Sequence, residues 1–190
     1  MKTFSTVPGK ERSRLIPCLL CGSDDLEPRY SIEGAEYVSC RGCGLVFQNP
    51  MPLSEELLGR YADEYFDYEV ENETNFFSLM LQTLSDVNFE EIEHVARDPK
   101  RFLDVGCATG MLIEYVKARG WEEKGIEVCS PAVEYGRRER KVDIIKTSLE
   151  EARFPAKHFS VVHFSHLIEH IPDPVRFMDE VVRITVPGGV

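Results

Sequence analysis

The sequence predicts an α/β protein in which a parallel, helix-covered sheet follows a small four-cysteine hairpin. From residue 100 onward, short apolar runs alternate with helical patterns, which is typical of a parallel sheet. Before it, two Cys-x-x-Cys pairs, Cys18/Cys21 and Cys40/Cys43, flank strand-like segments. We therefore expect four parts: a flexible N-terminus at 1–14, a cysteine ribbon at 15–48, a helical linker or lid region at 53–97, and an α/β domain at 100–190.

Charge and hydropathy exclude several classes of protein. The formal net charge of −11 disfavours a nucleic-acid binder, because phosphate contacts require a basic face. No apolar run is long enough to span a bilayer, and the N-terminus lacks the apolar core of a signal peptide. We therefore expect a cytoplasmic protein without membrane contact.

The N-terminal part is expected to form a short hairpin. Segments Glu27–Ile32 and Glu36–Val38 are predicted strands, joined by a turn at Glu33-Gly34-Ala35. Asn49-Pro50-Met51-Pro52 then breaks regular structure and is expected to be a linker.

The four cysteines predict a closed metal site. Cys18 and Cys21 are separated by two residues, as are Cys40 and Cys43, and eighteen residues lie between the pairs. Two residues between thiolates let both sulfurs of one knuckle reach the same ion, and four thiolates suit tetrahedral Zn²⁺. A rubredoxin-like iron site uses the same knuckles and is the alternative. We expect the zinc to be structural, because so small a hairpin buries too little apolar surface to fold alone.

The middle of the chain is expected to be helical. Ser54, followed by two glutamates, predicts a helix start, with a hydroxyl cap and acids in the first turn. The segment Thr74–Ala96 predicts one or two further amphipathic helices.

The α/β domain is expected to alternate strictly. The predicted strands are Arg101–Val105, Glu123–Val128, Val142–Lys146 and Phe159–Phe164. The predicted helices are Gly110–Arg119, a helix from Ser130 to about Arg140, and a helix capped by Asp173-Pro174. Open sheets of this kind bind ligands at the carboxyl ends of their strands.

The strand-to-helix turn at Gly106, Ala108 and Gly110 predicts a ligand lying against the backbone. Small residues clear the approach, and the helix N-terminus behind them offers free N–H groups. The dinucleotide pattern G-x-G-x-x-G fits poorly, since Met111 stands at its last glycine. Glu127 ends the next strand twenty-one residues after Gly106, where a carboxylate can accept hydrogen bonds from ribose hydroxyls.

From residue 100 the chain resembles class I S-adenosylmethionine-dependent methyltransferases. The resemblance rests on Asp104-x-Gly106-x-Ala108-x-Gly110, Glu127, Glu169-His170, Asp173-Pro174 and the final Val-Pro-Gly-Gly. It implies a Rossmann-like fold and S-adenosylmethionine, or S-adenosylhomocysteine, as cofactor. It also implies His170 as a general base with Glu169 beside it, whereas we expect His94, His158 and His163 to have no role. The implied cofactor-binding residues are Asp104, Gly106, Cys107, Ala108, Gly110, Glu127, Val128, Ser148, Leu149 and Ser165.

The first half narrows the resemblance. A four-cysteine ribbon, then Gly-Leu-Val-Phe-Gln-Asn-Pro-Met-Pro and a tyrosine-rich helix, resembles bacterial methyltransferases that include nucleotide-sugar C-methyltransferases. This implies a small-molecule substrate, such as a nucleotide sugar. Two alternatives stay open: an RNA or protein methyltransferase that docks through the ribbon, and a non-catalytic module that binds the cofactor or a partner.

The sheet is expected to be incomplete. Class I methyltransferases have seven strands, whereas four are predicted here, and the chain stops where a fifth is expected. We therefore expect either a fragment truncated after the fourth strand or a homodimer in which a second copy covers the open edge.

Overall fold

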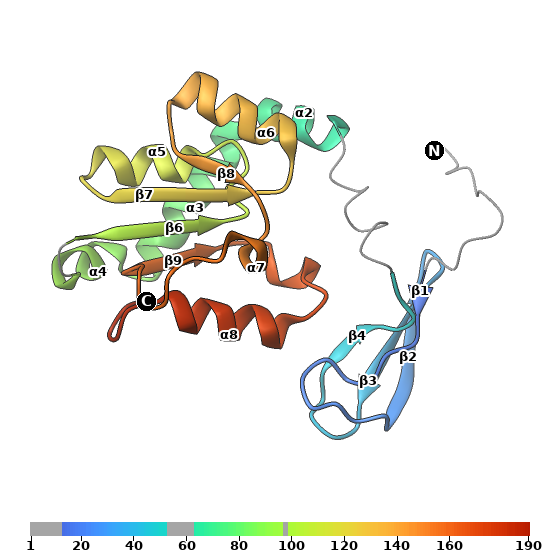
Figure 1. The fold of residues 1–190 in the computed structure, drawn as a ribbon. Helices are drawn as coiled ribbons and strands as arrows, with labels where there is room; N and C mark the ends of the chain where they lie inside the picture. The colour runs from blue at the N-terminus through green and yellow to red at the C-terminus, as the bar shows by residue number, and fades with distance from the viewer. Residues whose placement is uncertain (1–12, 53–62, 97–98) are drawn as a thin grey trace. The chain divides into compact units, whose positions relative to one another are not determined.

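A computed structural model describes residues 13–52, 63–96 and 99–190. The chain divides into two compact units, residues 1–60 and 61–190 (Figure 1). From residue 61 the region expected as a helical linker or lid therefore belongs to the second unit. The helix start expected at Ser54 lies outside the described residues.

The first unit contains a three-stranded antiparallel sheet with the order β2-β3-β4. These strands are β2 (Leu26–Ile32), β3 (Ala35–Cys40) and β4 (Val46–Gln48). Glu33 and Gly34, both at positive φ, form the turn between β2 and β3, which confirms the predicted hairpin.

The ends of this unit differ from the expectation. Ser13–Arg14, expected within the flexible N-terminus, form β1 and pair with β5 (Met51–Pro52), expected as a linker. Asn49 explains why the two segments meet. Its buried amide accepts a hydrogen bond from Ile16 N–H (3.1 Å) and donates one to the Ile16 carbonyl (2.9 Å). One side chain thus replaces the backbone pairing that a longer strand would supply.

The second unit is a four-stranded parallel sheet with the order β8-β7-β6-β9, which confirms the α/β class. Its strands are β6 (Arg101–Val105), β7 (Glu122–Glu127), β8 (Ile144–Lys146) and β9 (Val161–Phe164). Its helices are α2 (Asp63–Glu71), α3 (Glu73–Asp86), α4 (Phe89–Val95), α5 (Met111–Ala118), α6 (Ser130–Tyr135), α7 (Leu149–Ala152) and α8 (Pro174–Ile184).

Helices cover both faces of this sheet (Figure 1). On one face α7 and α8 pack against alternate side chains of β6, including Leu103 and Val105. On the other face α3, α4 and α5 pack around Phe102. Phe102 meets Phe89 and Trp121 at ring-centroid distances of 5.9 and 5.7 Å. Side chains from one strand thus anchor both layers, as expected for a strand buried on both faces.

The helix expected from Ser130 to about Arg140 changes form midway. The α-helix ends at Tyr135, and a π-helical segment, η1 (Gly136–Arg140), follows. A Cβ on Gly136 would lie 2.5 Å from Ile144 Cδ1 and 2.7 Å from the Thr109 carbonyl oxygen. Only glycine therefore lets this helix approach the turn after β6 so closely. Two short helices, α7 and the 3-10 turn η2 (Ile168–His170), were not predicted.

The outer edge of β9 is bonded at one place. Val190 N–H donates to the Ser160 carbonyl (3.0 Å), and Val162 N–H donates to the Val190 carbonyl (2.8 Å). The homodimer expected along this edge stays a prediction. Within the described parts of the chain, no helix has the length and hydropathy needed to cross a membrane.

Candidate functional site

The turn after β6 brings left-handed backbone conformations to the carboxyl edge of the sheet. Gly106, Ala108 and Gly110 have φ values of 73°, 48° and 81°. The N–H groups of Gly106 and Cys107 both donate to the Ile126 carbonyl of β7, at 2.9 and 3.2 Å. The turn is therefore fixed to the neighbouring strand before α5 begins.

Gly110 and Gly106 lack a side chain for different structural reasons. A Cβ on Gly110 would lie 2.8 Å from Val142 Cγ2 and 2.9 Å from Ile144 Cδ1, so this position is set by packing. A Cβ on Gly106 would lie 3.2 Å from Leu167 Cδ1, in the loop that follows β9. The side chain of Leu167 thus lies beside Gly106, which is itself exposed between the β6 and β9 loops, where a ligand of an open α/β sheet binds.

Glu127 joins the ends of β6 and β7. Its Oε2 accepts a hydrogen bond from Ala108 N–H (3.0 Å), and its Oε1 accepts from Val128 and Cys129 N–H (2.7 and 2.8 Å). Thr147 N–H, in the loop after β8, donates to the Glu127 carbonyl (3.1 Å). A carboxylate offers about four acceptor positions, so about one remains on Glu127 after these contacts.

The other predicted cofactor residues divide into exposed and structural positions. Val128 is 38% exposed, and Ser165, after β9, is exposed as well. Ser148 caps α7 by accepting from Glu151 N–H (3.3 Å), and the side chain of Leu149 is buried in the core. At 148–149 the backbone is therefore better placed than the side chains to contact a ligand.

Cys107, also predicted to contact the cofactor, is buried between the turn and α5. Its side chain packs with Ile113 and Val133, and burial is the main reason that its pKa lies well above the usual value. Asp104 adds to this effect. The Cys107 thiol is thus an inert core group, and its backbone is the part that lies in the turn.

Asp104 is paired with a histidine to which the sequence assigned no role. Asp104 is 3% exposed, and its Oδ1 lies 2.7 Å from Nδ1 of His163. The two residues are register partners on β6 and β9. Burial acts to lower the pKa of His163, but the neighbouring carboxylate raises it above its ordinary value. No sequence pattern pairs residues 59 positions apart until strand order and register are known.

The predicted catalytic pair lies in the η2 turn after β9. Glu169 and His170 are both exposed. The Glu169 carboxylate lies 3.7 Å from Nδ1 of His166. Glu169 and His170, three and four residues after His166, lie at the same edge of the sheet as the glycine turn.

In the first unit the four cysteines of the ribbon come together. Their Sγ atoms all lie within 4.8 Å of one another, with 3.5 Å between Cys18 and Cys43 and 3.5 Å between Cys21 and Cys40. Tetrahedral Zn²⁺ with bonds of about 2.3 Å places its sulfur ligands about 3.8 Å apart. The observed cluster therefore has the size and the ligand set of a closed zinc site.

The thiols of this cluster compete for protons. Burial acts to raise the pKa of Cys18, but the N–H groups of Cys21 and Leu20 and the neighbouring thiols lower it to about 6. A backbone contact at Ser23 acts to lower the pKa of Cys21, yet the thiols of Cys40 and Cys18 raise it to about 12. Four sulfurs at these distances are best satisfied by a shared cation, which replaces the protons.

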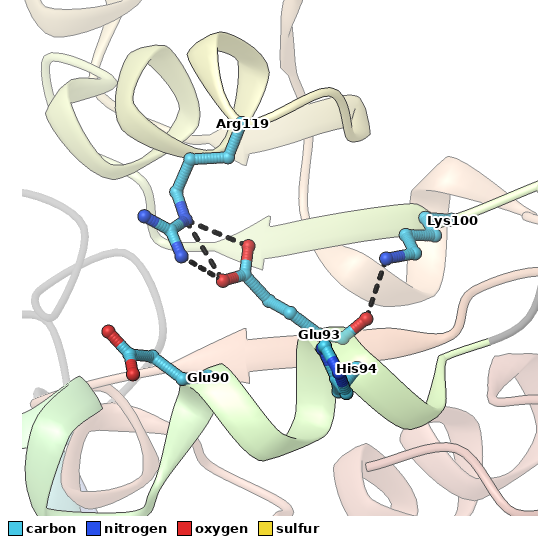
Figure 2. Close-up of a pocket in the computed structure, with 5 residues that line it drawn as sticks. All are labelled: Glu90, Glu93, His94, Lys100 and Arg119. Atoms are coloured by element: carbon cyan, nitrogen blue, oxygen red, sulfur yellow. Dashed lines mark hydrogen bonds and ion pairs between the residues drawn. The ribbon is translucent and has the colours of Figure 1, made fainter.

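A polar cavity of about 490 Å³ lies at the opposite, amino edge of the sheet (Figure 2). Figure 2 shows the Glu93 carboxylate directed at Arg119, while Lys100 Nζ donates to the Glu93 carbonyl at 2.6 Å. Glu93 also accepts from Trp121 Nε1 (2.9 Å). Hydrogen bonds from Arg119 are the main cause of the lowered pKa of Glu93. This cluster fastens α4 to the sheet and is separate from the predicted site.

Comparison with known proteins supports the assignment of the second unit. A family model described as "Methyltransferase domain" matches residues 80–190. The ubiquinone biosynthesis O-methyltransferase of Saccharophagus degradans is 36% identical over 98 residues, 47% of this chain and 41% of that protein. The enzyme of the same name from Marinobacter nauticus is 32% identical over 152 residues, 76% of this chain and 60% of that protein. The chain spans about half the length of the curated relatives it matches.

A solved structure supports the fold. The plantazolicin methyltransferase BpumL, in complex with SAH, aligns with a TM-score of 0.55 and 18% identity, over 68% of this chain and 52% of that one. The match to the family model covers more than half of the sequence, including the turn after β6 and the loop after β9. The chain therefore belongs to the family of S-adenosylmethionine-dependent methyltransferase domains.

Proposed function

We propose that the second unit binds S-adenosylmethionine at the carboxyl edge of its sheet, and that the protein transfers the methyl group to a small molecule. One observation carries this proposal: the Glu127 carboxylate is tied to the glycine turn by Ala108 N–H and keeps about one acceptor position. A ribose hydroxyl is the partner that suits a half-buried carboxylate at this point.

The residues present fit this cofactor. Gly106 is exposed in the turn, with the flexible side chain of Leu167 beside it, and the exposed side chain of Val128 follows Glu127 at the end of β7. When bound, the cofactor supplies a methyl group on a sulfonium, which is an activated leaving group. The protein then has two tasks, which are to hold the acceptor in line with the methyl group and to remove its proton.

For the proton we propose His170, with Glu169 beside it. An imidazole has its ordinary pKa near neutral pH, so it can accept a proton from the acceptor under working conditions. Both residues are exposed in η2, at the edge where the glycine turn lies. Asp104, below the turn, is proposed to face the amino group of the cofactor.

For the ribbon we propose a structural Zn²⁺ held by Cys18, Cys21, Cys40 and Cys43. The sulfur atoms are close enough to bind one ion, and four of them fill all four positions of a tetrahedral ion. No coordination position is then left for a substrate, which supports a structural rather than a catalytic ion.

The acceptor is proposed to be a small molecule, with nucleotide sugars as the first class to test. Two curated relatives carry the name ubiquinone biosynthesis O-methyltransferase, so small-molecule acceptors occur among related proteins. Residues 13–52 hold five acidic and three basic side chains. Arg41 among them lies 3.2 Å from Glu27. The acidic excess disfavours the alternative in which the ribbon docks on RNA, whereas the exposed Arg29, Tyr30 and Arg41 favour it, so RNA stays in the test as the second class of acceptor.

The test is calorimetric titration of the protein with S-adenosylhomocysteine, followed by an assay of methyl transfer. We expect saturable binding, and transfer of labelled methyl from S-adenosylmethionine to a nucleotide sugar in a panel that also contains phenols and RNA. No binding of S-adenosylhomocysteine would overturn the cofactor site. Transfer to phenols alone would overturn the nucleotide-sugar assignment, and transfer to RNA alone would overturn the small-molecule class.

A further inference from the structure

The Asp104–His163 pair lies directly below the proposed cofactor site. Asp104 is two residues before Gly106, and its side chain shares a face of β6 with Phe102. The ring of His163 stacks on Phe102, with centroids 6.2 Å apart and planes 25° apart. The imidazole is therefore held on two sides, by an aromatic ring and by a carboxylate 2.7 Å from Nδ1.

Each member of the pair keeps one unused polar atom. No described residue makes a hydrogen bond to Asp104 Oδ2 or to His163 Nε2. Among the described residues, the single buried side-chain nitrogen or oxygen without a partner is Arg140 Nε. Both atoms of the pair are therefore within reach of solvent or a ligand, although Asp104 as a whole is buried.

We propose that His163 is a positioning residue, which occupies one oxygen of Asp104 and couples binding of an ammonium-bearing ligand at the other oxygen to loss of a proton from the imidazole. This inference rests on the proposed function, since the α-ammonium group of the cofactor is the cation expected there. The inference gives a role to His163, for which the sequence predicts none.

Asp104 is the charged group that faces His163. The charges on the surrounding elements are paired elsewhere: Glu73 of α3 and Glu114 of α5 with Arg140, Glu93 of α4 with Arg119, and Lys117 of α5 with Glu123 of β7. Glu69 of α2, Asp104 and Glu127 all act on the buried Cys107. A cation that arrives at Asp104 therefore acts directly on His163, the histidine that this carboxylate contacts.

The direction of the coupling follows from like-charge repulsion. In the free protein the Asp104 carboxylate raises the pKa of His163, so the imidazole holds its proton to a higher pH than usual. An ammonium group beside the same carboxylate disfavours the imidazolium and lowers that pKa. Binding then releases a proton, and affinity for the ligand rises with pH between the two pKa values. A ligand carboxylate at this place would have the opposite effect.

The experiment measures protons exchanged when the 190-residue chain binds S-adenosylhomocysteine. Titrations near neutral pH in buffers of different ionisation enthalpy give the number of protons released. We expect release approaching about one proton for S-adenosylhomocysteine and none for 5′-methylthioadenosine, which lacks the ammonium group. The comparison of the two ligands needs only the natural chain, so it holds even if a variant fails to fold.

His163→Gln removes the titrating group and keeps an N–H donor for Asp104. It should bind S-adenosylhomocysteine without proton release and with an affinity that no longer depends on pH in this range. His158→Gln, which changes a histidine just before β9, should release protons as the natural chain does. Proton uptake, no release from the natural chain, or unchanged release from His163→Gln would overturn the inference while leaving cofactor binding intact. Absence of any binding would instead overturn the proposed cofactor site, and the coupling with it.

Discussion

Replacement of Glu127 by glutamine separates the two roles that the structure gives this carboxylate. The amide oxygen of glutamine can still accept from Val128 and Cys129 N–H, as Oε1 of Glu127 does. Its NH₂ group then faces Ala108 N–H, which donates to Oε2 in the natural chain at 3.0 Å. The variant therefore loses one of the bonds that tie β7 to the glycine turn, as well as the acceptor position proposed for ribose.

The two losses have separate magnitudes. A buried N–H left without its charged acceptor costs about 1–3 kcal/mol, which corresponds to a fall in Tm of roughly 3–10 °C for a domain of this size. About one acceptor position is left on Glu127 for the ligand, so one hydroxyl bond to a charged group is lost from the complex. That bond contributes about 1.5–3 kcal/mol, or about 10- to 100-fold in affinity for S-adenosylhomocysteine.

Thermal unfolding and calorimetric titration measure these effects independently. Glu122→Gln is the matched control, because it makes the same change at the other end of β7 and removes only an exposed ion pair with Arg101. It should change the unfolding free energy by less than about 1 kcal/mol and leave affinity unchanged. A folded Glu127→Gln chain whose affinity stays within about twofold of the natural chain would refute the ribose contact.

Two further predictions concern the ribbon and the amino edge of the sheet. Treatment with a zinc chelator, or the substitution Cys40→Ser, should abolish hydrogen-exchange protection in residues 13–52 and leave the sheet of the second unit protected. Protection of the ribbon without metal would contradict the proposed zinc site. Glu93→Gln should destabilise the second unit at neutral pH, because Arg119 lowers the pKa of Glu93 and this stabilisation is present above the ordinary carboxyl pKa. The difference in Tm between the natural chain and Glu93→Gln should shrink as pH falls through the lowered pKa of Glu93. The control Glu90→Gln, which removes no hydrogen bond, should show no such trend. A difference in Tm that stays constant with pH would contradict a stabilising Glu93–Arg119 ion pair.

Local patterns account for the part of the fold that the sequence predicts correctly. Strand β6 matches its predicted bounds, since apolar residues lead directly into a turn of small residues. The helix after Ser130-Pro131 begins as predicted, with proline in the first turn. Its change to a π-helical segment begins at Gly136, where the helix lies close to Thr109 and Ile144. Contacts of that kind join distant positions, so no local pattern contains them.

The same distinction applies to the site. The positions of Glu127 and the glycine turn at the strand ends could be predicted from the sequence, because each lies a fixed number of residues from the end of a strand. The Asp104–His163 pair could not, because it requires β6 and β9 to be neighbours in a defined register. The pairing of β1 with β5 through Asn49 was missed for the same reason. Leu149 stays a predicted cofactor residue, and because its side chain is buried in the core the prediction now concerns its backbone.

The carboxylates at the two edges of the sheet have different hydrogen-bond and ion-pair partners. This difference supports the proposed cofactor site at the carboxyl edge more strongly than the cavities do. At the amino edge, Glu93 is neutralised by Arg119 and also accepts from Trp121, so nothing on it remains for a ligand. At the carboxyl edge, no described lysine or arginine forms an ion pair with Glu127, whose partners are backbone N–H groups. Among the residues that the structure describes, the ion-pair partner of Asp104 there is a titratable histidine, His163. Carboxylates that are held in place but not neutralised by a fixed cation retain charge for hydroxyl and ammonium groups. The cavity of about 490 Å³ at the amino edge is therefore a structural junction, whereas the carboxyl edge, where we propose that the cofactor binds, has unfilled acceptor positions.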